Sequence, residues 1–110
     1  MKQSEEEVLA EALAHLAAIE RYSLQNIEDE MVQDAVALRL VALIETLGRL
    51  PEETRQVVLG DDWRLMRGMR NRLVHGYMTV DPGVIRVTVS EELKPLRQQL
   101  EGHIARLGAQ

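Results

Sequence analysis

Four side chains that could act together on a phosphodiester lie within eight residues of this sequence. They are Arg70, Asn71, His75 and Tyr77. A histidine can take up and release a proton near neutral pH, and an arginine can stabilise negative charge that develops on phosphate oxygens. The same residue types also serve ordinary roles, because a histidine near a helix end can be a cap and an arginine can be a solvated surface group. Both interpretations stay open on the chemistry of these residues alone.

The apolar residues around this motif predict a helix that would carry it. They recur at spacings of three and four residues and form one stripe: Trp63, Met66, Met69 and Leu73. Asn71 and His75 are four residues apart and share a face, whereas Arg70 and His75 diverge by roughly 140° around the helix. Arg70 can still flank the same cleft because its side chain is long. Gly76 is a helix stop signal, so we expect His75 in the last turn and Tyr77 just beyond it.

The whole pattern predicts an all-α fold, an up-and-down bundle of four longer helices plus a short helix, in one domain over residues 1–110. The core must be aliphatic and methionine-rich, because the chain has no phenylalanine and one tryptophan. Ser4 with Glu7 three residues later is typical of a helix start, and Asp61 or Asp62 is the expected cap of the motif helix. The expected helices cover about residues 5–24, 28–50, 51–59, 62–75 and 95–106.

The second of these helices is apolar nearly all the way round between Ala35 and Ile44, broken only by Arg39. Such a pattern indicates burial on several sides, which one small domain rarely provides, so we expect a partner subunit to cover part of this helix. Glu45 follows the apolar run directly. Its carboxylate could be solvated, or it could turn toward the motif cleft and orient the arginine or the histidine.

Residues 84–89 have the β-branched, alternating character of a strand. The chain offers no second strand with which they could pair, and a lone strand is not stable. We therefore expect helix in this segment despite its propensity. Pro95 should kink the backbone or restart a helix there.

Composition excludes several classes of function. The chain has no cysteine and its three histidines are scattered, so we expect no metal and no cofactor. We expect His15 to be solvated or at the edge of the core, and His103 to be solvated. The net charge of −5 argues against bulk nucleic-acid binding, although the motif helix is locally basic. We expect a cytoplasmic protein, because there is neither a membrane-length apolar run nor the apolar core of a signal peptide. The basic residues of the motif helix are Arg64, Arg67, Arg70 and Arg72.

The sequence resembles the HEPN superfamily, and specifically its HepT-like branch. Arg70-x4-His75-x-Tyr77 matches the Arg-x4-His-x-Tyr motif of that branch, and Asn71 fills its usual polar position. Further likeness lies in Asp34-Ala35-Val36 with Arg39-Leu40, and in Leu50-Pro51-Glu52. Two departures stand out. Leu43-Ile44-Glu45-Thr46 replaces the Ile-Gly-Glu-Ala common in the family, and the segment after Asp81 is richer in valine than is usual.

This resemblance implies a metal-independent endoribonuclease that acts as the toxin of a toxin–antitoxin pair. Arg70 and His75 would be catalytic, Asn71 would support them, and Glu45 and Arg67 are possible cleft residues. The implied partners are an RNA substrate, a second copy of the chain in a homodimer or higher oligomer, and a minimal nucleotidyltransferase (MNT) antitoxin. That antitoxin would neutralise the toxin by binding or by adding AMP to Tyr77.

Two other hypotheses compete with the ribonuclease. The chain could be a non-catalytic docking subunit that presents a substrate to a nucleotidyltransferase, a role that helical bundles of this kind also serve. It could also be an oligomeric bundle whose motif residues only close a core. The complete Arg-x4-His-x-Tyr motif favours the ribonuclease, because a docking module does not need it.

Overall fold

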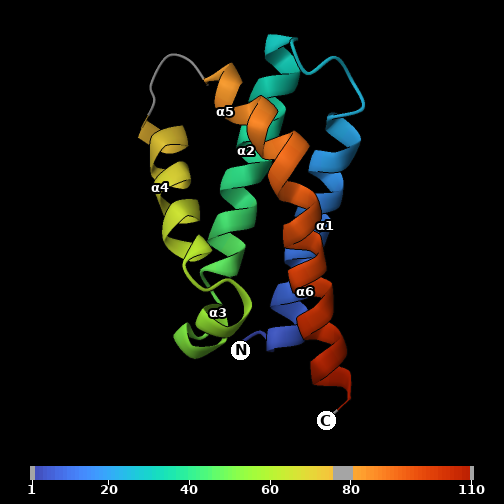
Figure 1. The fold of residues 1–110 in the computed structure, drawn as a ribbon, viewed down its shortest axis with the longest axis vertical. Coiled ribbons are helices and arrows are strands. Elements are labelled where there is room, and N and C mark those ends of the chain that lie inside the picture. Colours follow the sequence, from blue (N-terminus) through green and yellow to red (C-terminus); the bar gives the residue numbers. More distant parts are fainter. Residues whose placement is uncertain (1, 76–80, 110) are drawn as a thin grey trace.

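A computed structural model describes residues 2–75 and 81–109, and every regular element in these ranges is helical. The all-α prediction is therefore confirmed. The four longer helices and the short third helix follow the predicted order, and a further short helix with a π-helical turn precedes the last one (Figure 1). The elements are α1 (Glu5–Tyr22), α2 (Glu30–Leu47), α3 (Glu52–Val58), α4 (Asp62–His75), α5 (Pro82–Val87), the π-helical segment η1 (Thr88–Glu92) and α6 (Leu93–Gly108).

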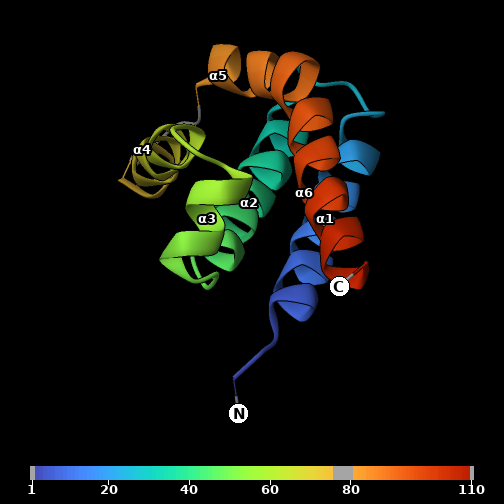
Figure 2. The same cartoon turned by 60° about the horizontal axis from the view of Figure 1, so that its bottom comes forward.

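The hydrophobic core lies mainly between α1, α2 and α6. Leu9, Leu16, Leu43 and Leu100 are fully buried there. Helix α4 is different, because it packs against α2 on one side and has no buried residue of its own. Figure 2 shows α4 standing apart from α1 and α6, on the far side of α2. The motif is thus carried by the least covered of the longer helices.

The predicted helix boundaries have local causes that the structure makes visible. The Ser4 hydroxyl accepts a hydrogen bond from the Glu7 backbone N–H, and the Glu7 carboxylate accepts one from the Ser4 N–H, so the expected capping box is present. Gly60 ends the short helix with a φ of 54°, a conformation that glycine adopts without strain. The second helix is shorter than expected at both ends, because the Asp29 side chain caps it and its last turn ends at Leu47.

Residues 82–92 are helical, as expected against their strand propensity. Asp81 caps this segment by accepting a hydrogen bond from the Gly83 N–H at 2.8 Å. Thr88 then donates its hydroxyl to the Val84 carbonyl at 2.7 Å, which satisfies a polar group inside the core. Ile85 and Thr88 are both buried, three residues apart on one helical face. The last helix restarts at Leu93 after the π turn, two residues earlier than expected.

The prediction that His103 is solvated was wrong. Its side chain is only 12% exposed, and its Nε2 atom lies 3.9 Å from Glu5 Oε2 across the α1–α6 contact. The prediction rested on the polar neighbours of His103 in the sequence, whereas its burial results from the packing of α6 against α1. His15 lies at the edge of the core, one of its two expected positions. None of the described helices is long and apolar enough to cross a membrane.

Candidate active site

Arg70 and Glu45 form an ion pair that joins α4 to α2. Arg70 Nη2 donates to Glu45 Oε1 at 2.8 Å, and the two side chains are 34% and 55% exposed. The sequence left two alternatives for Glu45, solvation or contact with a motif residue, and its carboxylate contacts Arg70 while staying 55% exposed. The pair holds one end of the guanidinium, and the Arg70 side chain stays 34% exposed, so an anion could still approach it.

Asn71 contacts the same guanidinium from the next position of the helix. Arg70 Nη1 donates to Asn71 Oδ1 at 3.4 Å, a long and weak hydrogen bond. Arg70 is therefore held by one strong and one weak acceptor. Asn71 is thus a second acceptor in contact with the guanidinium, and its supporting role stays a prediction.

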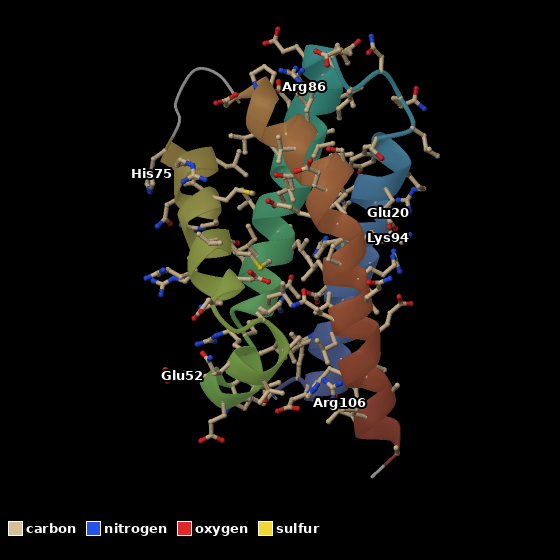
Figure 3. The ribbon with its side chains drawn as sticks, in the orientation of Figure 1. Glu20, Glu52, His75, Arg86, Lys94 and Arg106 are labelled. Carbon is tan, nitrogen blue, oxygen red and sulfur yellow. The ribbon has the colours of Figure 1, made fainter. Side chains whose placement is uncertain are left out.

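His75 lies in the last turn of α4 and is exposed (Figure 3). Within residues 2–75 and 81–109, no side chain makes a hydrogen bond to its imidazole. It sits five residues from Arg70, which is about 7.5 Å along the helix axis. One chain therefore presents one imidazole and one guanidinium at separate points of an open surface.

Of the remaining predicted site residues, the structure describes Arg67 but not Tyr77. Arg67 is exposed on α4, one turn before Arg70. The expected modification site, Tyr77, and the stop signal Gly76 lie outside the described residues.

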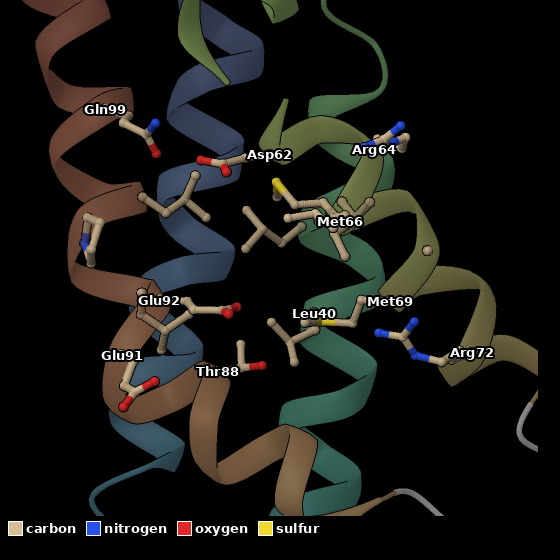
Figure 4. A pocket seen from close by; sticks show the side chains of 17 residues that line it. Leu40, Asp62, Arg64, Met66, Met69, Arg72, Thr88, Glu91, Glu92 and Gln99 are labelled. Atoms are coloured by element: carbon tan, nitrogen blue, oxygen red, sulfur yellow. The ribbon is translucent and has the colours of Figure 1, made fainter. Parts of the chain in front are cut away.

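One hollow lies on the side of α4 that faces away from Arg70. It is a groove of about 460 Å³ between α2, α4 and α6, with an aliphatic and methionine floor and a charged rim (Figure 4). Arg64 and Arg72 stand on the α4 wall, and Glu91 and Glu92 on the η1 wall. Arg70 turns away from this groove toward Glu45. His75 does not line the groove either, although it follows the lining residue Arg72 by three positions and so lies on the same side of α4. The floor includes Leu40, Leu43, Ile44, Met66, Met69 and Leu96.

A second hollow of about 430 Å³ adjoins Glu45 on the α1 side of α2. Its walls include His15, Thr46 and an ion pair between Arg49 and Glu11. The Thr46 hydroxyl donates to Glu11 at 3.0 Å, and this hydrogen bond is the largest cause that lowers the pKa of Glu11.

Sequence reasoning did not assign His15 or Arg39 to a site. Their positions are nevertheless linked, because His15 lines the second hollow and contacts Arg39. The one signal for this in the sequence was the interruption of the apolar run of α2 by Arg39. No group of three or more histidines and acidic residues that could hold a metal ion occurs in the described part of the chain.

Comparisons with known proteins show which family the chain resembles. The family model described as Ribonuclease HepT-like matches residues 9–102. A relative from Thermococcus cleftensis named "Probable ribonuclease HepT" is 26% identical over 106 residues, covering 92% of this chain and 96% of the relative. One from Caldanaerobacter subterraneus subsp. tengcongensis named "Putative RNase TTE0752" is 26% identical over 97 residues and covers 87% of each chain. No solved structure matches the chain significantly.

Proposed function

The chain belongs to the Ribonuclease HepT-like family, and from this premise we propose that it is a metal-independent endoribonuclease. We further propose that it is the toxin of a toxin–antitoxin pair, inhibited by a minimal nucleotidyltransferase. The observation that carries the catalytic proposal is the Arg70–Glu45 ion pair, which orients a guanidinium on the same helix as the exposed imidazole of His75. The names of the relatives support a ribonuclease as the class of enzyme.

The chemistry follows from how RNA can be cut without a metal ion. The 2′-hydroxyl attacks the neighbouring phosphorus, a base removes its proton, and an acid protonates the leaving 5′-oxygen. His75 can serve as the base or as the acid, and Arg70 can stabilise the extra negative charge on the phosphorane. Glu45 keeps the guanidinium in place, and Asn71 supports it. One chain supplies a single motif imidazole, so two copies of the chain would supply both proton-transfer groups.

The outer face of α2 supports such a pairing. It carries an apolar ridge formed by Met31, Ala35, Leu38 and Ala42, whose spacing keeps them on one side of the helix. Met31 and Leu38 are 80% and 71% exposed. This ridge runs directly into Glu45. A two-fold interface over the ridge would bury it and bring two copies of Arg70 and His75 to one cleft.

Modification of Tyr77 would inactivate such a site through simple electrostatics. Tyr77 follows His75 by two residues. An AMP group on its hydroxyl would place bulk and a negative phosphate close to Arg70. That phosphate would compete with RNA for the guanidinium. We therefore propose Tyr77 as the residue to which the antitoxin adds AMP.

The test is growth after induced expression, with no antitoxin present, of the wild type and of Arg70→Ala and His75→Ala. The matched control is Arg64→Ala, an exposed arginine of the same helix that lines the groove and does not contact Glu45. We expect arrest by the wild type and by the control, and relief by either motif variant. Purified wild type should cut RNA in the presence of a chelator. Circular dichroism on the purified variants checks that each of them is folded. Harmless wild type, or motif variants as toxic as the wild type, would reject the ribonuclease.

The alternative proposal is a non-catalytic subunit that docks on a nucleotidyltransferase. The apolar groove between α4 and α6 favours it, since an open groove of this size is a surface on which a partner could pack. The expression experiment separates the two proposals. A docking subunit would be harmless by itself, and its motif variants would behave as the wild type does.

A further inference from the structure

Arg39 is held in place by neutral groups. Its Nε donates to the Tyr22 hydroxyl at 3.2 Å, and its Nη1 contacts His15 Nδ1 at 3.1 Å. Its guanidinium carbon also lies 5.9 Å from the centre of the Tyr22 ring. Because a guanidinium only donates, His15 Nδ1 must accept, which leaves the imidazole proton on Nε2. Arg39 is therefore oriented without being neutralised.

Three acidic residues of α1 and α2 are engaged with cations other than Arg39. On α1, Glu11 pairs with Arg49 and Glu20 with Arg97. On α2, Glu45 pairs with Arg70. None of the ion pairs among residues 2–75 and 81–109 includes Arg39. Among these residues, the positive charge of Arg39 is therefore not taken up by an ion pair.

Arg39 lies on the same helix as Glu45, the residue that contacts Arg70 of the motif. It lies six residues before Glu45 on α2, which is about 9 Å along the helix axis. The hollow beside Glu45 connects the two places, because His15 lines that hollow and also contacts Arg39. An extended nucleic-acid strand whose cleaved phosphate sits at Arg70 could pass over this hollow and reach Arg39.

We propose that Arg39, positioned by Tyr22 and His15, binds a backbone phosphate of the RNA strand beside the phosphate that is cleaved. This inference rests on the proposed function, whose site it extends along α2. Arg39 neither donates nor accepts the reacting protons; it anchors the strand so that the cleaved bond lies at Arg70 and His75. An arginine that is already oriented loses little side-chain freedom when it binds a phosphate.

The test is binding of a short fluorescent polyuridine RNA with 2′-O-methyl groups throughout, which attack by a 2′-hydroxyl cannot cut. Its dissociation constant is measured by anisotropy between about 50 and 200 mM salt, where phosphate contacts dominate affinity. Arg39→Gln should weaken binding about 5- to 10-fold at the lower salt concentration and reduce the salt slope by about 0.7. Arg39→Lys should keep the slope. The matched control Arg106→Gln removes one charge at the far end of α6 (Figure 3) and should change the dissociation constant less than about twofold.

Equal affinity and salt slope for Arg39→Gln and Arg106→Gln would overturn the proposal, and so would a wild type that does not bind the RNA. Circular dichroism checks that Arg39→Gln is folded. If it is not, the proposal is tested with Arg39→Lys and with the imidazole NMR signals of His15 in the wild type. Those signals must shift when RNA is added. A cleavage assay on unmodified RNA separates this proposal from the ribonuclease. Binding that depends on Arg39 without any cleavage rejects only the enzyme, and cleavage with unchanged Arg39→Gln binding rejects only the subsite.

Discussion

Glu45 on α2 reaches across to Arg70 on α4 and accepts a hydrogen bond from its Nη2 atom at 2.8 Å. The two residues are 25 positions apart in the sequence, and both side chains are partly open to solvent. An ion pair with this exposure contributes little to the free energy of unfolding, about 0–1 kcal/mol. Its value would lie in holding the guanidinium in one orientation.

Glu45→Gln should therefore lower activity far more than stability. We expect a loss of about 10- to 100-fold in kcat/KM for RNA cleavage, because a displaced guanidinium no longer matches the charge of the transition state. The free energy of unfolding in urea should change by less than about 1 kcal/mol. Cleavage kinetics and urea titrations on the same samples measure both quantities. A large loss of stability would mean that Glu45 is mainly structural.

The ridge on α2 predicts how the chain associates. Leu38→Glu should turn a dimer into a folded monomer, because a carboxylate in the centre of an apolar interface is costly to bury. Sedimentation equilibrium measures the mass, and the variant should lose RNA cleavage along with the dimer. Leu65→Glu is the matched control, since Leu65 is 67% exposed but lies on α4. A dimer that survives Leu38→Glu would place the interface elsewhere.

The free energy of unfolding should fall in acid because the pKa of Glu11 is lowered in the folded chain. The Thr46 hydroxyl is the largest cause that lowers the pKa of Glu11 below its ordinary value of 4.5. The folded chain therefore binds a proton at Glu11 less readily than the unfolded chain does. This contribution to stability is complete above pH 4.5 and is lost as the pH falls through the lower pKa of the folded state.

Urea unfolding at several pH values between neutral and acid measures this effect. Thr46→Val removes the hydroxyl and keeps the shape of the side chain. The variant should lose less stability than the wild type on acidification. The pKa of Glu7 is also lowered, mainly by its hydrogen bond to the Ser4 backbone. This lowers the stability of both proteins on acidification, so it does not distinguish them. Identical pH dependence of the two proteins would show that the Thr46–Glu11 contact does not form in solution.

Residues 82–87 offer a test of helix against strand. Ile85 is fully buried and Val87 is 49% exposed, although in a strand the two would share a face. Ile85→Ala should cost about 2–5 kcal/mol in the free energy of unfolding, as expected for a large core side chain. Val87→Ala should change it by less than about 0.5 kcal/mol. Equal costs at both positions, measured by urea titration, would contradict the helical register.

Local patterns in the sequence determined the elements of this fold. Apolar spacing of three and four residues, the Ser4–Glu7 capping box and Gly60 each act within one or two turns of helix, so they could be predicted before any contact was known. The absence of a second strand candidate was enough to predict helix at residues 84–89. The motif helix and its order Arg70, Asn71, His75 came from the same local information, and the resemblance to HepT-like proteins supplied their expected roles.

Only the tertiary structure decided which side chains meet across helices. The choice of Arg70 as the partner of Glu45, the burial of His103 against α1 and the fixing of Arg39 by Tyr22 and His15 all join residues that are far apart in the sequence. Such contacts depend on the rotation and spacing of whole helices, which helical periodicity leaves undetermined. The same rotation of α4 turns Arg70 away from the apolar groove and toward Glu45 on α2.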